Sequence, residues 1–232
     1  MSDLKSKLRI VNDLSELEKD SPDGIYIYIN KRNFYKNYAM IIGPKNTPYF
    51  GGFFFFEIEF PKNYPKKPPS IKFLTIDGKV RFNPNLYENG KVCLSILGTW
   101  SGPGWKPVMN LRSILLSIRS LLGEYPIQNE PGFDKVLPTD KISINYNYFI
   151  IYNTYKLAFI SVLNSKFNKY SKFFKKAIKN ETKKNYEQMK NDLLSYNLSL
   201  KTIKFGKIIY FLPCGNILNF SKLLSDFQKL KI

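Results

Sequence analysis

Apolar residues at helical spacing predict a helix at each end of the chain. Near the start, they occur at Leu4, Leu8, Val11, Leu14 and Leu17. These steps of four and three place them on one face of a helix over residues 3–18. The last apolar stripe consists of Phe220, Leu223, Leu224, Phe227 and Leu230. We expect this final helix to pack back on the body, with a partner-binding helix as the alternative.

Between these helices the pattern first changes to short β-like runs. The predicted strands cover residues 25–30, 38–42, 52–60 and 70–74. The third run ends in alternation, which would place Phe56, Ile58 and Phe60 on one face and Glu57 and Glu59 on the other. The connections are short and contain Gly and Pro, so we expect an antiparallel four-stranded meander.

The pattern after the meander predicts a long loop and then helices. Residues 75–107 have little periodicity and many Gly, Pro and Asn residues, but they hold several aromatic anchors. A long irregular stretch of this kind in a compact chain is typically functional. Asn110 is a candidate N-cap for a helix that runs through residue 122. Beyond about residue 142 the pattern is helical again, in two or three segments, which gives an α+β fold class.

Composition indicates a globular, soluble protein. The 232 residues are 44% hydrophobic and 16% aromatic. The most apolar stretch, residues 148–163, is interrupted by polar side chains and is shorter than the roughly 20 residues that span a bilayer. The N-terminus is charged and lacks the apolar core of a signal peptide. We therefore expect no membrane association.

The net charge of +18 is concentrated in the C-terminal part, where residues 156–207 hold 13 lysines. A solvated basic surface is the simpler interpretation. Attraction to nucleic acid, anionic lipid or an acidic protein face is the alternative.

Cys93 is the candidate for chemistry, in a chain that contains no histidine. A Cys–His hydrolase is excluded because its base is missing. Two cysteines without histidine form neither a disulfide framework nor a four-ligand zinc site, so we expect no metal. If Cys93 is a nucleophile, it must receive an acyl group that is already activated. We expect the second cysteine, Cys214, to be an inert or buried thiol.

The residues around Cys93 resemble a known family. Pro84-Asn85 stands eight residues before the cysteine, after a Pro-rich turn at residues 64–69, and Asn129-Glu130-Pro131 follows the helix predicted at 110–122. This order resembles the ubiquitin-conjugating enzymes over about residues 4–160, and most closely their Z type. The resemblance implies the UBC fold, with a catalytic domain over residues 1–165 and a basic, mainly helical extension over 166–232.

The resemblance also implies thioester chemistry. Cys93 would accept the C-terminal carboxyl of ubiquitin, or of a ubiquitin-like modifier, from the thiol of an activating enzyme. It would pass this acyl group to a substrate lysine or to a ligase cysteine. ATP would be used by the activating enzyme, so no cofactor is expected on this chain. Asn85 would donate to the oxyanion or hold the loop, and a plain turn residue is the alternative.

The sequence departs from the family pattern near the thiol. Asn83 occupies the place of the family's usual histidine, a change that the Z type shares. Ser95 replaces an acidic residue that many members carry two positions after the cysteine. Orientation of the incoming lysine would then fall to Glu130, or to Asn129 as the second candidate. The insertion at residues 101–104 would form a flap near the thiol or simply lengthen the loop.

The resemblance further assigns partner-binding positions. Lys5, Lys7 and Arg9 lie off the predicted apolar stripe and would dock the acidic domain of the activating enzyme; a solvated helix face is the alternative. Lys66 takes the place of an aromatic residue that many members insert into RING-type ligases. Trp105-Lys106-Pro107 preserves the second contact loop.

Two other functions compete with this interpretation. A catalytically silent ubiquitin-binding scaffold is disfavoured because Cys93 is present. A basic nucleic-acid-binding protein is disfavoured because no RNP, KH or zinc-finger pattern occurs. The expected partners are thus the modifier, the activating enzyme, a ubiquitin ligase and a substrate lysine. The expected compartment is the cytoplasm, with the nucleus as a second location.

Overall fold

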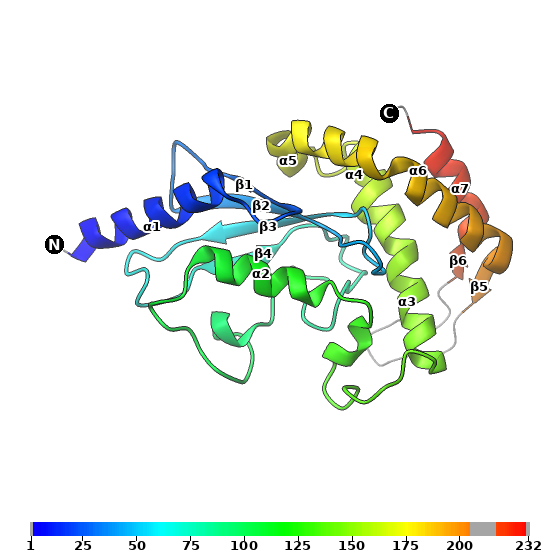
Figure 1. The fold of residues 1–232 in the computed structure, drawn as a ribbon, viewed down its shortest axis with the longest axis horizontal. Coiled ribbons are helices and arrows are strands. Elements are labelled where there is room, and N and C mark those ends of the chain that lie inside the picture. The colour runs from blue at the N-terminus through cyan, green and yellow to red at the C-terminus, as the bar shows by residue number, and fades with distance from the viewer. Residues whose placement is uncertain (1, 205–216, 231–232) are drawn as a thin grey trace.

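The computed structural model describes residues 2–204 and 217–230 and has an α+β architecture (Figure 1). The helices are α1 Ser2–Lys19, α2 Leu111–Leu121, α3 Lys141–Asn153, α4 Ser161–Leu163, α5 Asn168–Ser171, α6 Lys175–Leu200 and α7 Phe220–Gln228. A π-helix, Thr154–Ile160, joins α3 to α4, and short 3-10 turns occur at Ser95–Leu97, Pro126–Asn129 and Lys172–Phe174. The strands are β1 Ile25–Tyr28, β2 Lys36–Ile42, β3 Phe53–Glu59, β4 Ser70–Phe73, β5 Thr202–Lys204 and β6 Ile217–Asn219.

Strands β1 to β4 form one antiparallel sheet in sequential order. Ile25 pairs with Ile41, Ile42 with Phe53, and Phe56 with Phe73. The predicted meander and α+β class are therefore confirmed. Within the two described ranges, no helix combines the length and apolar character that a membrane crossing needs.

The run Phe53–Phe56 at the start of β3 is buried on both faces of the sheet. Phe54 and Phe56 lie on one face, where they pack against Phe73, and Phe54 also contacts Phe82 edge-on. The alternation predicted for the end of the run is confirmed, since Phe56, Ile58 and Phe60 are buried while Glu59 is exposed. A strand that is apolar on both faces needs cover on both, because exposed aromatic rings lose their hydrophobic stabilisation.

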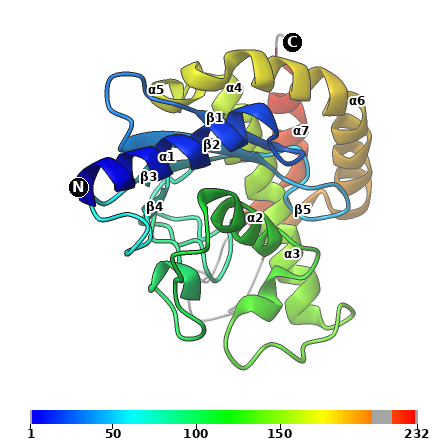
Figure 2. The same ribbon diagram turned by 60° about the vertical axis from the view of Figure 1, so that its left-hand side comes forward.

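The C-terminal segment covers the second face of this sheet (Figures 1 and 2). Phe173 stacks on Tyr28 and Tyr38 with ring centroids 4.0 and 5.0 Å apart. Phe174 stacks on Phe55 at 6.0 Å. Residues beyond 165 therefore complete the hydrophobic core of the body, which is one continuous cluster through both predicted parts.

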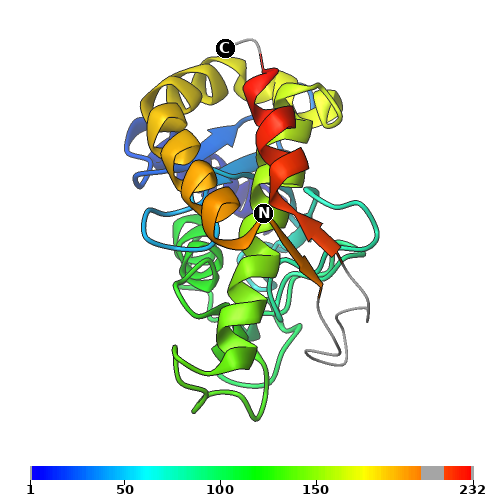
Figure 3. The same ribbon diagram turned by 90° about the vertical axis from the view of Figure 1, so that its right-hand side faces the viewer.

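Helices α6 and α7 extend this cluster and lie side by side (Figure 3). Met189 of α6 packs so closely against the loop before β3 that a Cβ on Gly51 would lie 2.2 Å from its sulfur. Gly51 also has a φ of +75°, so two constraints favour glycine there. Helix α7 buries Phe220, Leu223, Leu224 and Phe227, which confirms that it packs on the body.

The extension also contains two short paired strands that the sequence pattern did not predict. Strands β5 and β6 form a short hairpin between α6 and α7, although each has only three residues. The sequence gives no clear alternation over such short strands, so the pattern contains little signal for them. Cys214 lies outside the described residues.

The predicted apolar stripe of α1 is wrong in its first half. Leu4, Leu8 and Val11 are 64%, 55% and 50% exposed. The buried face instead runs through Ile10, Asp13, Leu14 and Leu17. This set follows the i, i+3, i+4, i+7 spacing of a helix face more closely, but it contains a carboxylate that hydrophobicity alone would assign to solvent.

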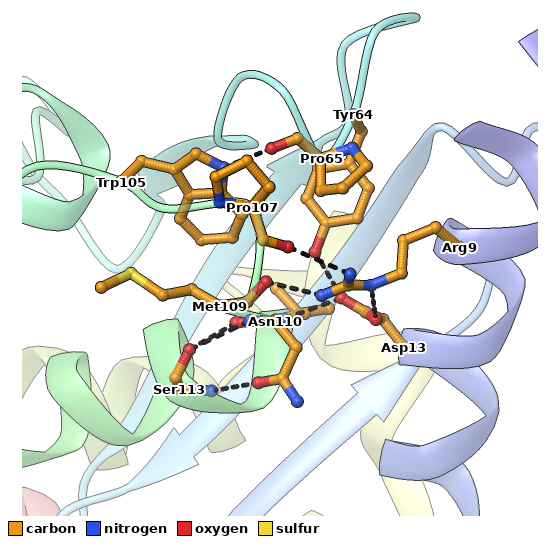
Figure 4. Close-up of polar contacts among 10 residues, drawn as sticks. Arg9, Asp13, Tyr64, Pro65, Trp105, Pro107, Met109, Asn110 and Ser113 are labelled. Atoms are coloured by element: carbon orange, nitrogen blue, oxygen red, sulfur yellow. Dashed lines mark hydrogen bonds and ion pairs between the residues drawn. The ribbon is translucent and has the colours of Figure 1, made fainter. Parts of the chain in front are cut away.

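The Asp13 carboxylate joins three distant segments (Figure 4). It accepts hydrogen bonds from Arg9 Nε at 2.8 Å, from the backbone N–H of Leu111 at 3.0 Å and from the Tyr64 hydroxyl. The Arg9 guanidinium also donates to the carbonyls of Pro107 and Met109. Burial and this carboxylate raise the pKa of Tyr64, so the phenol remains a donor. The start of α2, the turn at residue 64 and α1 are thereby fixed relative to one another.

The shared core predicts that an extension residue stabilises the catalytic part. Both tryptophans, Trp100 and Trp105, lie before residue 165 and report on that part alone. We expect Phe174→Ala to lower the unfolding free energy by about 3–5 kcal/mol, because a buried ring is lost from the sheet face. Urea unfolding followed by tryptophan fluorescence measures this.

The matched control is Leu198→Ala on the same helical extension, where the side chain is 77% exposed. It should change the unfolding free energy by less than about 0.5 kcal/mol. A tryptophan transition that is unchanged by Phe174→Ala would show that the extension unfolds independently of the catalytic part.

Candidate active site

Cys93 and Asn85 hold each other through a reciprocal pair of hydrogen bonds. The Cys93 N–H donates to the Asn85 carbonyl at 2.9 Å, and the Asn85 side-chain amide donates to the Cys93 carbonyl at 2.7 Å. Between them, Gly90 turns the chain at a φ of +91°, where a Cβ would lie 2.7 Å from the Phe73 carbonyl oxygen. The arrangement fits the loop-holding role predicted for Asn85, because its amide contacts the backbone of the thiol residue.

The Asn83 side chain holds the backbone of Asn85 through a hydrogen bond. Its side-chain oxygen accepts from the Asn85 N–H at 2.9 Å, and its amide donates to the Leu121 carbonyl and the Tyr49 hydroxyl. Burial raises the pKa of Tyr49, which keeps this phenol neutral as a donor to the Phe82 carbonyl. An asparagine thus provides both the acceptor and the donor that this buried site requires. Its amide does not ionise, so these hydrogen bonds do not depend on pH through Asn83.

The Cys93 side chain is fully buried, with 0% exposure. The Thr99 hydroxyl bridges the backbone on both sides of the cysteine: it donates to the Val92 carbonyl at 2.7 Å and accepts from the Leu94 N–H at 3.0 Å. Gly102 of the predicted flap lies beside Ser95, and a Cβ there would be 3.1 Å from the Ser95 Cβ. The 94–104 loop is therefore folded against the segment that holds the thiol.

Glu130 is a buried carboxylate paired with Arg81. It is 6% exposed and forms an ion pair with Arg81, with Nη2 and Oε2 3.9 Å apart. Arg81 in turn donates to the Pro84 carbonyl at 2.5 Å and lies over the Tyr87 ring. In the structure the carboxylate is held by Arg81 and supports the segment that carries Asn85. A role of Glu130 in orienting a lysine stays a prediction.

Asn129 is better placed than Glu130 for contact with a substrate. It is exposed, and its amide lies 3.4 Å from the Leu121 carbonyl that Asn83 also contacts. Asn129 is thus the more exposed of the two predicted candidates. The role of Asn129 in orienting a lysine stays a prediction.

Three of the predicted partner-binding residues, Arg9, Trp105 and Pro107, lie around the Asp13 carboxylate (Figure 4). Trp105 donates from Nε1 to the Pro65 carbonyl at 2.6 Å, which places the Lys106-Pro107 loop beside exposed Lys66. Arg9 reaches the same loop through the Pro107 carbonyl. Lys5 is exposed and Lys7 is half-buried on α1.

Arg9 was predicted to be an exposed charge that docks the activating enzyme. In the structure its guanidinium is bonded to other parts of the chain. Partial burial lowers its pKa, but the hydrogen bond and charge of Asp13 outweigh this effect and the pKa is raised overall. The guanidinium is engaged with Asp13 and two backbone carbonyls, so it acts first as a structural link.

Sequence reasoning missed Thr99 and Asp13. Thr99 lies in the long loop that was predicted only as irregular, yet it bonds to the backbone of both neighbours of Cys93. A hydroxyl six residues from the thiol in a Gly-rich loop was the available signal. For Asp13, the sequence contained no signal beyond its position between Ile10 and Leu14 on the buried face of α1.

Comparison with known proteins agrees with this geometry. The family model for ubiquitin-conjugating enzymes matches residues 9–140. Ubiquitin-conjugating enzyme E2 Z from Xenopus tropicalis is 46% identical over 160 residues, covering 68% of this chain and 51% of the relative. The human E2 Z is 45% identical over 161 residues, covering 68% and 45%. A probable ubiquitin-conjugating enzyme from Caenorhabditis elegans is 39% identical over 182 residues, covering 73% and 24%.

These matches confirm the predicted resemblance to the Z type. The chain aligns with about half the length of the E2 Z relatives. The matched residues include Asn85 and Cys93, and also Asp13 with its partners Arg9, Tyr64 and Leu111. The chain belongs to the ubiquitin-conjugating enzyme family.

Proposed function

We propose that this chain carries ubiquitin, or a ubiquitin-like modifier, as a thioester on Cys93. The Cys93 thiolate attacks the thioester carbonyl on an activating enzyme and expels that enzyme's thiolate. In the second step a substrate amine attacks the carbonyl on Cys93, the carbon–sulfur bond breaks, and an amide forms while the amine proton leaves. A ligase thiol in place of the amine gives a second thioester exchange. Neither step requires a cofactor on this chain.

The observation that carries this proposal is the Asn85–Cys93 pair in a histidine-free chain. Thiol-to-thiol exchange needs only the attacking thiolate and a comparable leaving group, so no base has to be supplied by the site. Holding the thiol residue at both its N–H and its carbonyl fixes the direction of attack. Asn85 therefore acts as a positioning residue through the Cys93 backbone.

The burial of Cys93 adds a requirement to this mechanism. A sulfur with no exposed surface does not reach a carbonyl on another protein. The 94–104 loop is bonded through Thr99 to the backbone on both sides of Cys93, so we propose that this loop moves and that the Thr99 hydrogen bonds break. We infer that loading includes an opening step.

The partners follow from the same proposal. The surface around Lys66, Lys106 and Pro107 would contact a ligase, and exposed Lys5 an activating enzyme with an acidic docking domain. We propose action in the cytoplasm, with the nucleus as a second compartment.

Incubation with activating enzyme, ATP and modifier should give an adduct on Cys93 that reducing agent removes. Cys93→Ser should give an adduct that resists reducing agent, because an oxygen ester replaces the thioester. Gel mobility with and without reductant measures both, with panels of activating enzymes and modifiers. Cys214→Ser is the matched control and should load like the wild type. A reductant-sensitive adduct that persists in Cys93→Ala would contradict the assignment.

Asn85→Ala should slow discharge of a preloaded thioester to free lysine by about tenfold or more, because the Cys93 carbonyl loses its donor. Asn89→Ala is the control, since Asn89 is exposed on the same loop and bonds only locally to the Lys91 N–H. Single-turnover discharge, started from equal amounts of thioester, measures the effect. A wild-type rate for Asn85→Ala would remove the positioning role.

A further inference from the structure

A groove in the extension, outside the active site, combines exposed lysines with an apolar floor. It has a volume of about 420 Å³ and lies between the turn at residues 162–171 and the first half of α6, at the top of Figure 1. Lys175, Lys179 and Lys183 line it from one side of α6. Val162 and Ile178, both buried, form part of its floor.

The three lysines have no carboxylate partner within the parts of the chain that the structure describes. Glu181 is the one acidic residue between positions 161 and 183. Its carboxylate is occupied elsewhere, since it accepts from the Tyr26 hydroxyl at 2.8 Å and from the Asn185 amide at 3.2 Å. The groove therefore carries uncompensated positive charge.

Thr182 provides an independent sign of a ligand. Its side chain is 3% exposed and lines the groove, yet its hydroxyl has no hydrogen-bond partner among the described residues. A buried hydroxyl without a partner is destabilising, so a hydrogen bond from a bound molecule would stabilise this position. The hydroxyl lies on the same stripe of α6 as the three lysines, between Lys179 and Lys183.

The spacing of the lysines indicates an extended ligand. Four residues of helix advance about 6 Å, so the ammonium groups are spread over about 12 Å along α6. An extended peptide repeats its side-chain direction every two residues, or about 6.6–7 Å. Three separate point charges beside an apolar floor suit this ligand better than one phosphate, for which converging donors and arginine forks are typical.

We propose that this groove binds a short acidic peptide segment of a partner protein, in which acidic and apolar residues alternate. Its carboxylates lie along Lys175, Lys179 and Lys183, and an apolar side chain contacts the floor. The Thr182 hydroxyl donates to an oxygen of the segment. The site thereby gives the extension a docking function that is independent of the Cys93 chemistry.

The test uses the full chain and a fluorescein-labelled peptide in which aspartate and leucine alternate, with binding followed by fluorescence polarisation at low salt. The triple variant Lys175→Gln, Lys179→Gln, Lys183→Gln should weaken binding at least about tenfold. The control triple Lys172→Gln, Lys176→Gln, Lys184→Gln removes the same charge from exposed positions outside the groove and should weaken it less than about threefold.

Thr182→Val separates the ligand contact from simple folding effects. It should weaken the peptide while leaving the thermal midpoint unchanged or higher, because a buried unpaired hydroxyl is removed. The proposal is overturned if the peptide does not bind, or if both lysine triples weaken it equally. It is also overturned if a peptide with asparagine in place of aspartate binds as well, or if millimolar inorganic phosphate displaces the probe.

Discussion

The four consecutive phenylalanines of β3 impose the constraint on which the rest of this structure depends. Because Phe53–Phe56 point alternately to both faces, a sheet covered on one side only would leave large rings in water. On one face Phe54 packs beside Phe73 of the neighbouring strand β4 and against Phe82, which lies outside the sheet. Phe173 and Phe174 from the C-terminal extension cover the other face. The extension is therefore part of the catalytic body's core, and the predicted division at residue 165 does not separate two hydrophobic clusters.

This core holds two polar arrangements at the edge of the fold. The Asp13 carboxylate fixes α1, the Tyr64 turn and the start of α2, and with them the surface that carries Lys66 and Trp105. Asn83, Arg81 and Glu130 form the buried support for the segment of Asn85 and Cys93. Cys93 is thus supported by neutral amides and one ion pair, which suits the proposed function of a thiol that exchanges acyl groups without its own base.

Sequence periodicity was sufficient for strands β1 to β4, for α2 with its Asn110 cap and for the buried face of α7, because each has a clear apolar pattern. Periodicity did not predict the positions at which polar interactions determine whether a side chain is buried. Asp13 is buried because three donors converge on it, and they come from positions up to 98 residues away. Glu130 was assigned to the substrate because only its chemistry was visible; its partner Arg81 is distant in sequence. The Thr99 hydrogen bonds to the backbone on both sides of Cys93 likewise depend on the loop geometry.

In the proposed function, Cys93 is a shielded carrier thiol that reacts only when the 94–104 loop opens. The most direct measurement is the rate of Cys93 alkylation by iodoacetamide, followed by mass spectrometry in a Cys214→Ser background. Folded protein should react at least about tenfold more slowly than the urea-unfolded chain, and Thr99→Val should narrow this difference, because opening then breaks fewer hydrogen bonds. A folded protein that reacts as fast as the unfolded chain would contradict the account.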